Sequence, residues 1–242
     1  MMQKQTNTLD SRSNKVLAEP TGDYERFLYS VSHDLQEPLR MVSSFLKLFE
    51  AKAGDTVSDE AKEYLNYCLE NADRMKRMMA ALVDLSRVNR SQEEIVPVDL
   101  NGVLNDLFSM YSNEIRLNEG VVEYDELPAV MMAPGQAVQL FKALVQNCFD
   151  YRAERPLCIE VRTVDKGDFC EITVKDNGKG INPLYLDKLF EMFKRFGHGN
   201  DHTGAGLTLA REIVKRYGGT ISLDSKEGEW TAVKFTLPKA VI

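Results

Sequence analysis

A histidine followed directly by an acid is the first feature of this chain that could do chemistry. His33 and Asp34 lie in the stretch VSHDLQEPLR, and the chain has only 3 histidines among its 242 residues. The surrounding pattern is helical, and Pro38 removes a backbone donor and bends a helix shortly afterwards. By themselves these residues fit a solvated surface histidine as well as a titratable ring with a chemical task.

Two glycine clusters in the second half of the chain indicate a nucleotide. In DNGKGI, Asp176 follows a predicted strand, and Gly178 and Gly180 allow the backbone to turn closely around a flat ligand. The carboxylate can accept a hydrogen bond from an exocyclic amine such as that of adenine. In GAGLTLAREIVKRYGG, Gly204 and Gly206 open into an amphipathic helix whose free N–H groups would attract phosphate. Each motif alone is also an ordinary turn, but the pair in this order predicts nucleotide binding.

The segment between the two clusters, LFEMFKRFGHGNDHTG, predicts a lid. Its first part is apolar and suits packing, whereas the rest is small and polar and could move over a ligand. Lys194 and Arg195 fit either phosphate charge or a solvated surface. His198 and His202 are four residues apart, but a metal site would need further ligands.

The elements that must position these groups divide near residue 90. Residues 23–52 predict one long helix and residues 58–90 a second, which Ser58 would cap, with a short loop between them. Both helices carry apolar residues at seven-residue intervals, which is typical of a coiled-coil seam. The series are Leu28, Leu35, Val42 and Phe49 in the first helix, and Leu65, Ala72 and Met79 with Cys68, Met75 and Leu82 in the second. Since a lone hairpin cannot bury such seams, we expect a homodimer that forms a four-helix bundle.

After residue 90, helices and antiparallel strands alternate without regular βαβ order. Helices are predicted near 100–117 and 134–151 and from about Leu207, and LCIEVRTVD and DFCEITVKD alternate apolar and polar residues as strands do. This pattern predicts an α+β fold with helices on one face of a mixed sheet. The expected domains are a flexible leader over 1–22, a dimerisation hairpin that carries His33 over 23–90, and an α/β sandwich over 91–242.

Composition excludes other classes of function. Apolar residues make up 43% of the chain, as in a globular protein, and the net charge of −7 disfavours nucleic acid as a partner. No apolar run approaches the ~20 residues of a membrane span, and the polar first 20 residues lack the apolar core of a signal peptide. The 4 cysteines have no metal-ligand spacing, so we expect small buried side chains in a reducing cytoplasm.

Five motifs in order resemble the transmitter core of a bacterial sensor histidine kinase, particularly the phytochrome-like subgroup. SHDLQEPLR resembles the phosphoacceptor box, LFKALVQNCFDYR the asparagine box, DNGKGI the first glycine box, LFEMFKRF the phenylalanine box and GAGLTLA the second glycine box. Together they cover roughly residues 23–237. The resemblance implies a helical hairpin that dimerises and an ATP-binding sandwich of the gyrase, Hsp90, histidine kinase and MutL type.

The resemblance also implies a role for each matching residue. His33 would attack the γ-phosphate of ATP while Asp34 orients its ring, and the phosphoryl group would pass to an aspartate of a response regulator receiver domain. Asn147 matches the asparagine that helps to bind Mg²⁺, and Asp176 matches the adenine-reading aspartate. Further expected nucleotide contacts are Tyr151, Arg152, Gly178, Gly180, Lys194, Arg195, Gly204, Gly206 and Leu207.

The asparagine box departs from the family pattern at two positions. A second amide or acid is usual four residues before Asn147, where this chain has Ala143, and a basic residue is usual three residues after it, where this chain has Asp150. Charge neutralisation is the largest electrostatic term in phosphoryl transfer, so both changes bear on rate. Arg152 could compensate in part, and Thr208 stands where glycine is common in the second glycine box.

Three functions compete on these observations. An ATP-dependent protein-histidine kinase accounts for all five motifs. A catalytically degenerate dimer that transfers phosphate or docks a regulator, with a vestigial nucleotide domain, is favoured by Ala143 and Asp150 but leaves the glycine boxes without a purpose. An ATPase of the wider gyrase and Hsp90 superfamily explains the second half of the chain but gives His33 no role.

Overall fold

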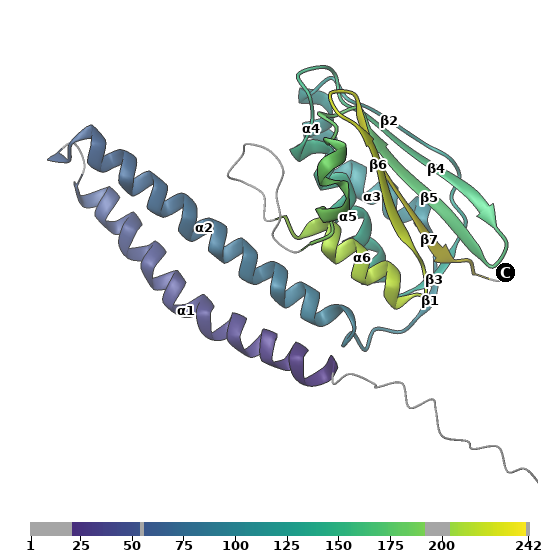
Figure 1. The fold of residues 1–242 in the computed structure, drawn as a ribbon, viewed down its shortest axis with the longest axis horizontal. Helices are drawn as coiled ribbons and strands as arrows, with labels where there is room; N and C mark the ends of the chain where they lie inside the picture. The colour runs from purple at the N-terminus through teal and green to yellow at the C-terminus, as the bar shows by residue number, and fades with distance from the viewer. Residues whose placement is uncertain (1–20, 54–55, 192–203, 241–242) are drawn as a thin grey trace, which may run out of the picture.

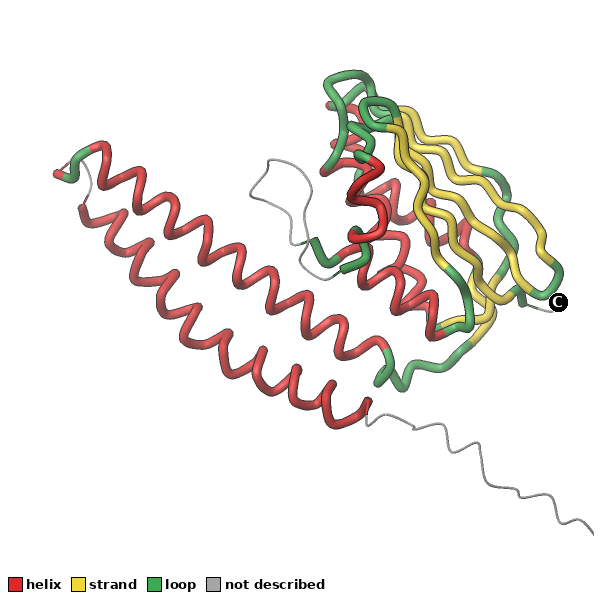
Figure 2. The backbone as a smooth tube through the Cα atoms, in the orientation of Figure 1, coloured by secondary structure: helices red, strands yellow, loops and turns green. Residues whose placement is uncertain are grey.

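Two long helices lead into a layered α/β unit in this computed structural model (Figure 1). The structure describes residues 21–53, 56–191 and 204–240. Helices α1 (Thr21–Ala53) and α2 (Asp59–Val88) run antiparallel, side by side along their length (Figure 2). They match the two predicted helices, and within the described ranges no helix is both long and apolar enough to cross a membrane.

Ser58 caps α2 where the sequence predicts. Its Oγ accepts a hydrogen bond from the backbone N–H of Ala61 at 3.3 Å, and Asp59 and Glu60 occupy the first turn. Acidic side chains in that turn interact favourably with the positive end of the helix dipole. The side-chain cap and the dipole together explain why the chain re-enters a helix at this point.

The apolar seams lie partly inside the hairpin and partly on its surface. Leu39, Leu65 and Ala72 are buried. Many other large apolar side chains of the two helices are exposed, and they are Val31, Leu35, Met41, Val42, Phe45, Leu48, Phe49, Tyr64, Tyr67 and Met75. An exposed apolar surface of this extent is typical of a protein–protein contact.

A five-stranded mixed sheet forms one layer of the α/β unit. Its strand order is β2-β4-β5-β7-β6, with β2 parallel to β4 and the other neighbours antiparallel. The strands are β2 (Val121–Tyr124), β4 (Cys158–Lys166), β5 (Phe169–Asp176), β6 (Ile221–Lys226) and β7 (Trp230–Pro238). A separate antiparallel pair joins β1 (Val96–Val98) to β3 (Val130–Met132). The mixed sheet agrees with the predicted fold class.

Helices cover one face of this sheet, as predicted (Figure 1). The helices of the α/β unit are α3 (Leu100–Met110), α4 (Ser112–Leu117), α5 (Pro134–Asp150) and α6 (Gly206–Arg216), with a short 3₁₀ helix η2 (Pro183–Lys188). Alternate strand residues such as Ile172 and Val174 are buried in the core that these helices complete. The single helix predicted over 100–117 is divided, because the backbone at Tyr111 ends α3 and begins α4 with φ −92° and ψ 9°.

The prediction that all four cysteines are buried is wrong for two of them. Cys148 and Cys170 are buried, whereas Cys158 is half-buried and Cys68 is exposed. Cys158 lies on the face of β4 that points away from the helices, because successive strand residues point to opposite faces. Cys68 belongs to the second apolar series of α2, so its burial would require a partner on that face.

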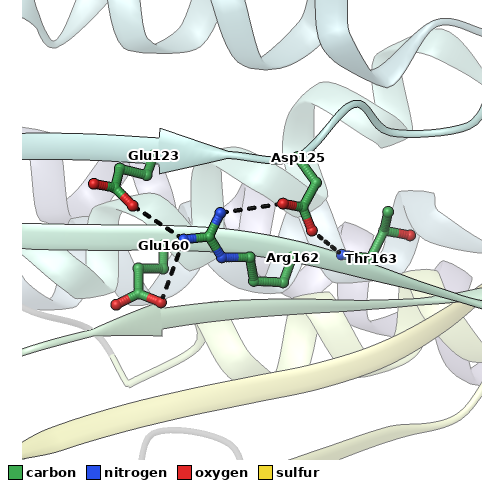
Figure 3. Close-up of polar contacts among 5 residues, drawn as sticks. All are labelled: Glu123, Asp125, Glu160, Arg162 and Thr163. Atoms are coloured by element: carbon green, nitrogen blue, oxygen red, sulfur yellow. Dashed lines mark hydrogen bonds and ion pairs between the residues drawn. The ribbon is translucent and has the colours of Figure 1, made fainter.

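An ionic cluster joins edge strand β2 to β4 on the face away from the helices (Figure 3). Arg162 contacts Glu123 at 3.0 Å, Asp125 at 3.1 Å and Glu160 at 3.8 Å. The N–H of Thr163 donates to Asp125 Oδ2 at 3.1 Å. This backbone hydrogen bond, followed by that from Arg162, holds the pKa of Asp125 below its ordinary value. The cluster therefore adds ionic contacts to the short parallel pairing at this edge.

The C-terminal end of α2 is fastened to the α/β unit. The Val88 carbonyl accepts hydrogen bonds from Gln136 Nε2 at 2.8 Å and from Arg216 Nη1. Arg216 Nη2 also donates to the Ser91 carbonyl at 2.8 Å. These bonds orient the hairpin relative to α5 and α6.

Candidate active site

The predicted phosphoacceptor segment lies within α1. His33 and Asp34 are both helical, Asp34 is exposed, and the side chain of His33 lies outside the described residues. Pro38 is inside the same helix, so residue 38 donates no hydrogen bond to the carbonyl of Asp34 one turn earlier. Within one chain, α2 packs against α6 and lies between α1 and the α/β unit (Figure 1). The structure therefore keeps this segment apart from the two glycine clusters that are predicted to bind a nucleotide.

Asp176 is the last residue of β5 and points into the helix-covered side of the sheet. Its side chain is only 9% exposed, and its Oδ1 accepts a hydrogen bond from the N–H of Gly178 at 2.8 Å. Burial raises the pKa of Asp176 from its ordinary 3.8 to about 6, against the opposing effects of the Gly178 N–H, the Cys148 thiol and Arg155. A buried carboxylate at a strand end, beside a glycine loop, is suited to accept a hydrogen bond from a planar ligand.

The two glycines after Asp176 allow close approach of the backbone. A Cβ at Gly178 would lie 2.5 Å from the carbonyl oxygen of Tyr151. Gly180 has φ +61°, a left-handed conformation, and a Cβ there would collide with the carbonyl of Lys226. Both positions therefore require glycine for the shape of this loop, as the motif predicts.

The second glycine cluster faces α5. Gly204 has φ +69°, and Gly206 begins α6. A Cβ at Gly206 would lie 3.5 Å from Asn147 Oδ1, so the helix start and this amide are neighbours. The free N–H groups at the start of α6 and the Asn147 side chain thus come together.

Asp150 lies at the end of α5, and hydrogen bonds connect its carboxylate to the junction of α3 and α4. Its Oδ1 accepts a hydrogen bond from Gln146 Nε2 at 2.7 Å, and Gln146 Oε1 accepts one from the Tyr111 hydroxyl at 2.7 Å. Burial, and then the charge of Asp150, raise the pKa of Tyr111. Ala143, half-buried one turn before Asn147, offers no side-chain oxygen. The sequence alone did not predict the contacts that orient Asp150.

Of the remaining predicted nucleotide contacts, the structure describes three and gives each a place in the α/β unit. Tyr151 ends α5, and its carbonyl accepts the N–H of Lys179 in the first glycine loop at 2.9 Å. Arg152 Nη1 donates to the carbonyl of Phe149 at 3.0 Å, and Leu207 packs against the hydrophobic core. Lys194 and Arg195 lie outside the described residues.

Thr208 provides an anchor that the sequence did not predict. The residue is buried in α6, and its Oγ1 donates to the carbonyl of Phe190 at 2.9 Å. The Arg211 guanidinium lies 5.7 Å from the centre of the Phe190 ring. A glycine at 208 could not make this hydrogen bond, so the threonine fastens the beginning of the phenylalanine box to α6.

The donor set suits a metal ion that arrives with a nucleotide. In the parts of the chain that the structure describes, no group of three His, Cys, Asp or Glu side chains is placed to hold a metal ion. Mg²⁺ is commonly held by one or two protein oxygens together with phosphate and water. The single amide of Asn147 beside the α6 N-terminus fits that pattern.

Two family models match successive parts of the chain. Residues 23–91 match the His Kinase A (phospho-acceptor) domain, and residues 133–241 match the Histidine kinase-, DNA gyrase B-, and HSP90-like ATPase. The first match contains α1 and α2, and the second contains Asn147, Asp176 and both glycine clusters. The two halves of the predicted site thus fall in two recognised domains.

Curated relatives are sensor proteins of greater length. Phytochrome-like protein Cph1 of Synechocystis sp. is 26% identical over 224 residues, which is 92% of this chain and 30% of the relative. Cyanobacterial phytochrome B of Nostoc sp. is 31% identical over 231 residues, 93% of this chain and 30% of the relative. Sensor protein kinase WalK of Staphylococcus saprophyticus is 29% identical over 224 residues, which is 89% of this chain and 37% of the relative. The chain therefore spans about a third of the length of these relatives.

Solved structures share the fold. Full-length ShkA in complex with AMPPNP matches with a TM-score of 0.66 at 20% identity, over 90% of this chain and 46% of that chain. The Acinetobacter baumannii histidine kinase AdeS matches with a TM-score of 0.59 at 17% identity, over 86% of this chain and 98% of that chain. At such identities these matches establish the arrangement of a helical hairpin followed by an α/β sandwich.

Proposed function

Because the chain carries, in order, the phosphoacceptor and ATPase domains of a sensor histidine kinase transmitter core, we propose that it phosphorylates itself on His33 with ATP and passes the phosphoryl group to an aspartate of a response regulator receiver domain. The observation that carries this proposal is the nucleotide site: a buried carboxylate, Asp176, beside a glycine loop, together with Asn147 at the N-terminus of α6. The proposed reaction takes place in the cytoplasm.

The binding step uses the groups of the α/β unit. Asp176 accepts a hydrogen bond from the exocyclic amine of adenine, and the loop through Gly178 and Gly180 lets the backbone lie against the base. The N–H groups at the start of α6 and the positive end of its dipole stabilise the phosphates. Mg²⁺ bound with the nucleotide would be held by Asn147 and would neutralise phosphate charge.

The transfer step uses the groups of α1. A ring nitrogen of His33 attacks the γ-phosphorus, and the new N–P bond forms as the bond from phosphorus to the β–γ bridging oxygen breaks. ADP leaves with the electron pair of that bond. Asp34 accepts a hydrogen bond from the other ring nitrogen and holds the imidazole in the reactive tautomer.

The phosphoacceptor domain also implies dimerisation, which the exposed apolar surface of the hairpin supports. Leu35, Val42, Phe45 and Phe49 of α1 are each between 47% and 62% exposed in one chain. Four helices from two copies would cover this surface in a bundle. The partner proposed for the seam is therefore a second copy of this chain.

The altered asparagine box favours slow transfer. Ala143 removes one oxygen ligand, and Asp150 puts a negative charge where the family has a positive one. Like charge near the γ-phosphate costs about 1–4 kcal/mol at the effective dielectric of a protein surface, and about 1.4 kcal/mol of barrier is tenfold in rate. The same residues support a second function, a phosphotransfer or docking dimer that uses His33 without ATP.

Calorimetric titration with ADP and Mg²⁺ distinguishes the two functions. The kinase proposal requires saturable binding that Asp176→Ala abolishes. A parent chain that binds no ADP at millimolar concentration would exclude the kinase and favour the phosphotransfer or docking dimer.

A further inference from the structure

Arg155 joins two turns at one end of the sheet. Its Nε donates to the carbonyl of Asn177 at 2.8 Å, and its Nη2 donates to the carbonyls of Gly178 at 3.0 Å, Gly228 at 3.0 Å and Glu229 at 2.6 Å. The first two carbonyls belong to the glycine loop after β5, and the other two belong to the turn between β6 and β7. One guanidinium group therefore connects backbone segments that are far apart in the sequence.

The two turns also touch each other directly. The N–H of Gly228 donates to the carbonyl of Lys179 at 2.6 Å, and Gly180 lies so close to the Lys226 carbonyl that no side chain would fit. On its other side, the loop after β5 is held by the carbonyl of Tyr151. The loop thus lies between the end of α5 and the β6–β7 turn, and its shape depends on both.

We propose that Arg155 is a positioning residue of the nucleotide site, which holds the carbonyls of Asn177 and Gly178 so that Asp176 and the glycine loop are preformed for the adenine base. This inference rests on the proposed function. A loop that is already ordered binds more tightly because it does not lose conformational freedom during binding. Arginine suits this role because its planar group presents five donors in a fixed fork, whereas lysine presents one point charge.

The charge of Arg155 has a second effect on the same site. The groups that face the Asp176 carboxyl are the N–H of Gly178, the Cys148 thiol of α5 and the Arg155 guanidinium, and each of them favours the ionised form against burial. Removing Arg155 would therefore raise the pKa of Asp176. Because adenine needs the ionised carboxylate as an acceptor, nucleotide affinity would begin to fall at a higher pH.

The chain contains a natural reporter beside this group. A cavity of about 440 Å³ is lined in part by Arg155, Asp176, Asn177, Glu229 and Trp230. Trp230 is the only tryptophan of the chain, and Lys175 Nζ lies 5.6 Å from the centre of its ring. Its fluorescence therefore reports on the packing of the two turns.

The test measures ADP affinity by calorimetry for the full chain and three variants. Arg155→Ala is expected to weaken ADP binding by at least about tenfold, and Arg155→Lys by an intermediate amount, because lysine retains the charge but not the fork. Arg162→Ala is the matched control: Arg162 is an arginine of β4 whose partners are carboxylates on the face away from the helices (Figure 3). Its affinity for ADP is expected to stay within about twofold of the parent.

Two further measurements separate positioning from loss of fold. Amide hydrogen exchange is expected to accelerate at Gly178, Lys179 and Gly228 in Arg155→Ala while the core strands stay protected, and the emission of Trp230 is expected to change. The pH at which ADP affinity falls is expected to rise in Arg155→Ala and to stay unchanged in Arg155→Lys.

An Arg155→Ala variant with affinity within about twofold of the parent, or with unchanged exchange in the loop, would overturn the inference. If the parent itself binds no ADP, the proposed function fails, and the exchange and fluorescence measurements still decide whether Arg155 holds the loop.

Discussion

Replacing Asp176 by asparagine is expected to strengthen the fold while it removes nucleotide recognition. Burial raises the pKa of Asp176 from 3.8 to about 6, so the ionised carboxylate destabilises the folded state at neutral pH. This difference in pKa corresponds to roughly 3 kcal/mol. Asparagine is uncharged and keeps an oxygen that can accept the Gly178 N–H, so we expect Asp176→Asn to raise the free energy of unfolding by about 1–3 kcal/mol at pH 8.

The sign of the pH dependence follows from the raised pKa. Above pH 6 the carboxyl is ionised in both the folded and the unfolded state, and the full cost of burying the charge is present. As the pH falls from about 6 to 3.8 the folded state takes up a proton first, and the cost disappears. The stability advantage of the variant is therefore expected to be largest above pH 6 and to vanish below about 3.8.

Urea unfolding of the parent and the variant between pH 8 and pH 4, without nucleotide, measures this advantage. Asp165→Asn is the opposite control, because Lys239 and the Gly167 N–H lower the pKa of Asp165, so that its ionised form is stabilising at neutral pH. Saturating ADP is expected to raise the unfolding midpoint of the parent but not that of Asp176→Asn. An Asp176→Asn variant that is less stable than the parent at pH 8, or whose advantage does not change with pH, would refute the reasoning.

Three further predictions concern other parts of the chain. Thr208→Val, which replaces the hydroxyl by a methyl group of similar size, is expected to lower the free energy of unfolding by about 1 kcal/mol, and urea unfolding of parent and variant measures the difference. Leu35→Lys is expected to dissociate the dimer, since it puts a charge in the seam, and a dimer that persists in light scattering at micromolar concentration would contradict the proposed bundle. Ala143→Asn with Asp150→Lys is expected to raise the rate of autophosphorylation at least about tenfold with a smaller change in ADP affinity, and single-turnover labelling that shows no acceleration would contradict this account of the altered box.

The elements were predictable where one local signal decides the structure. Seven-residue repeats predicted α1 and α2, the cap at Ser58 predicted the start of α2, and strand alternation predicted β4 and β5. The break at Tyr111 was not predicted, because α3 and α4 share one apolar pattern and the backbone turn depends on packing against α5.

The site was predictable where a motif requires one residue type. Gly180 has a left-handed backbone and Asp176 ends a strand, so their places follow from the motif. Arg155 was not predicted, because the four carbonyls that it joins come from turns that only the folded sheet brings together. The orientation of Asp150 depends in the same way on Tyr111, the residue between α3 and α4.

The central claim is tested most directly by incubating the chain with γ-labelled ATP and Mg²⁺ and comparing it with His33→Gln. We expect the parent to acquire an acid-labile, base-stable label, and we expect His33→Gln to acquire none while it still binds ADP and unfolds at the same urea concentration. Label that persists in His33→Gln would contradict the account. So would an unlabelled parent that binds ADP, if the Ala143→Asn, Asp150→Lys double variant also stays unlabelled.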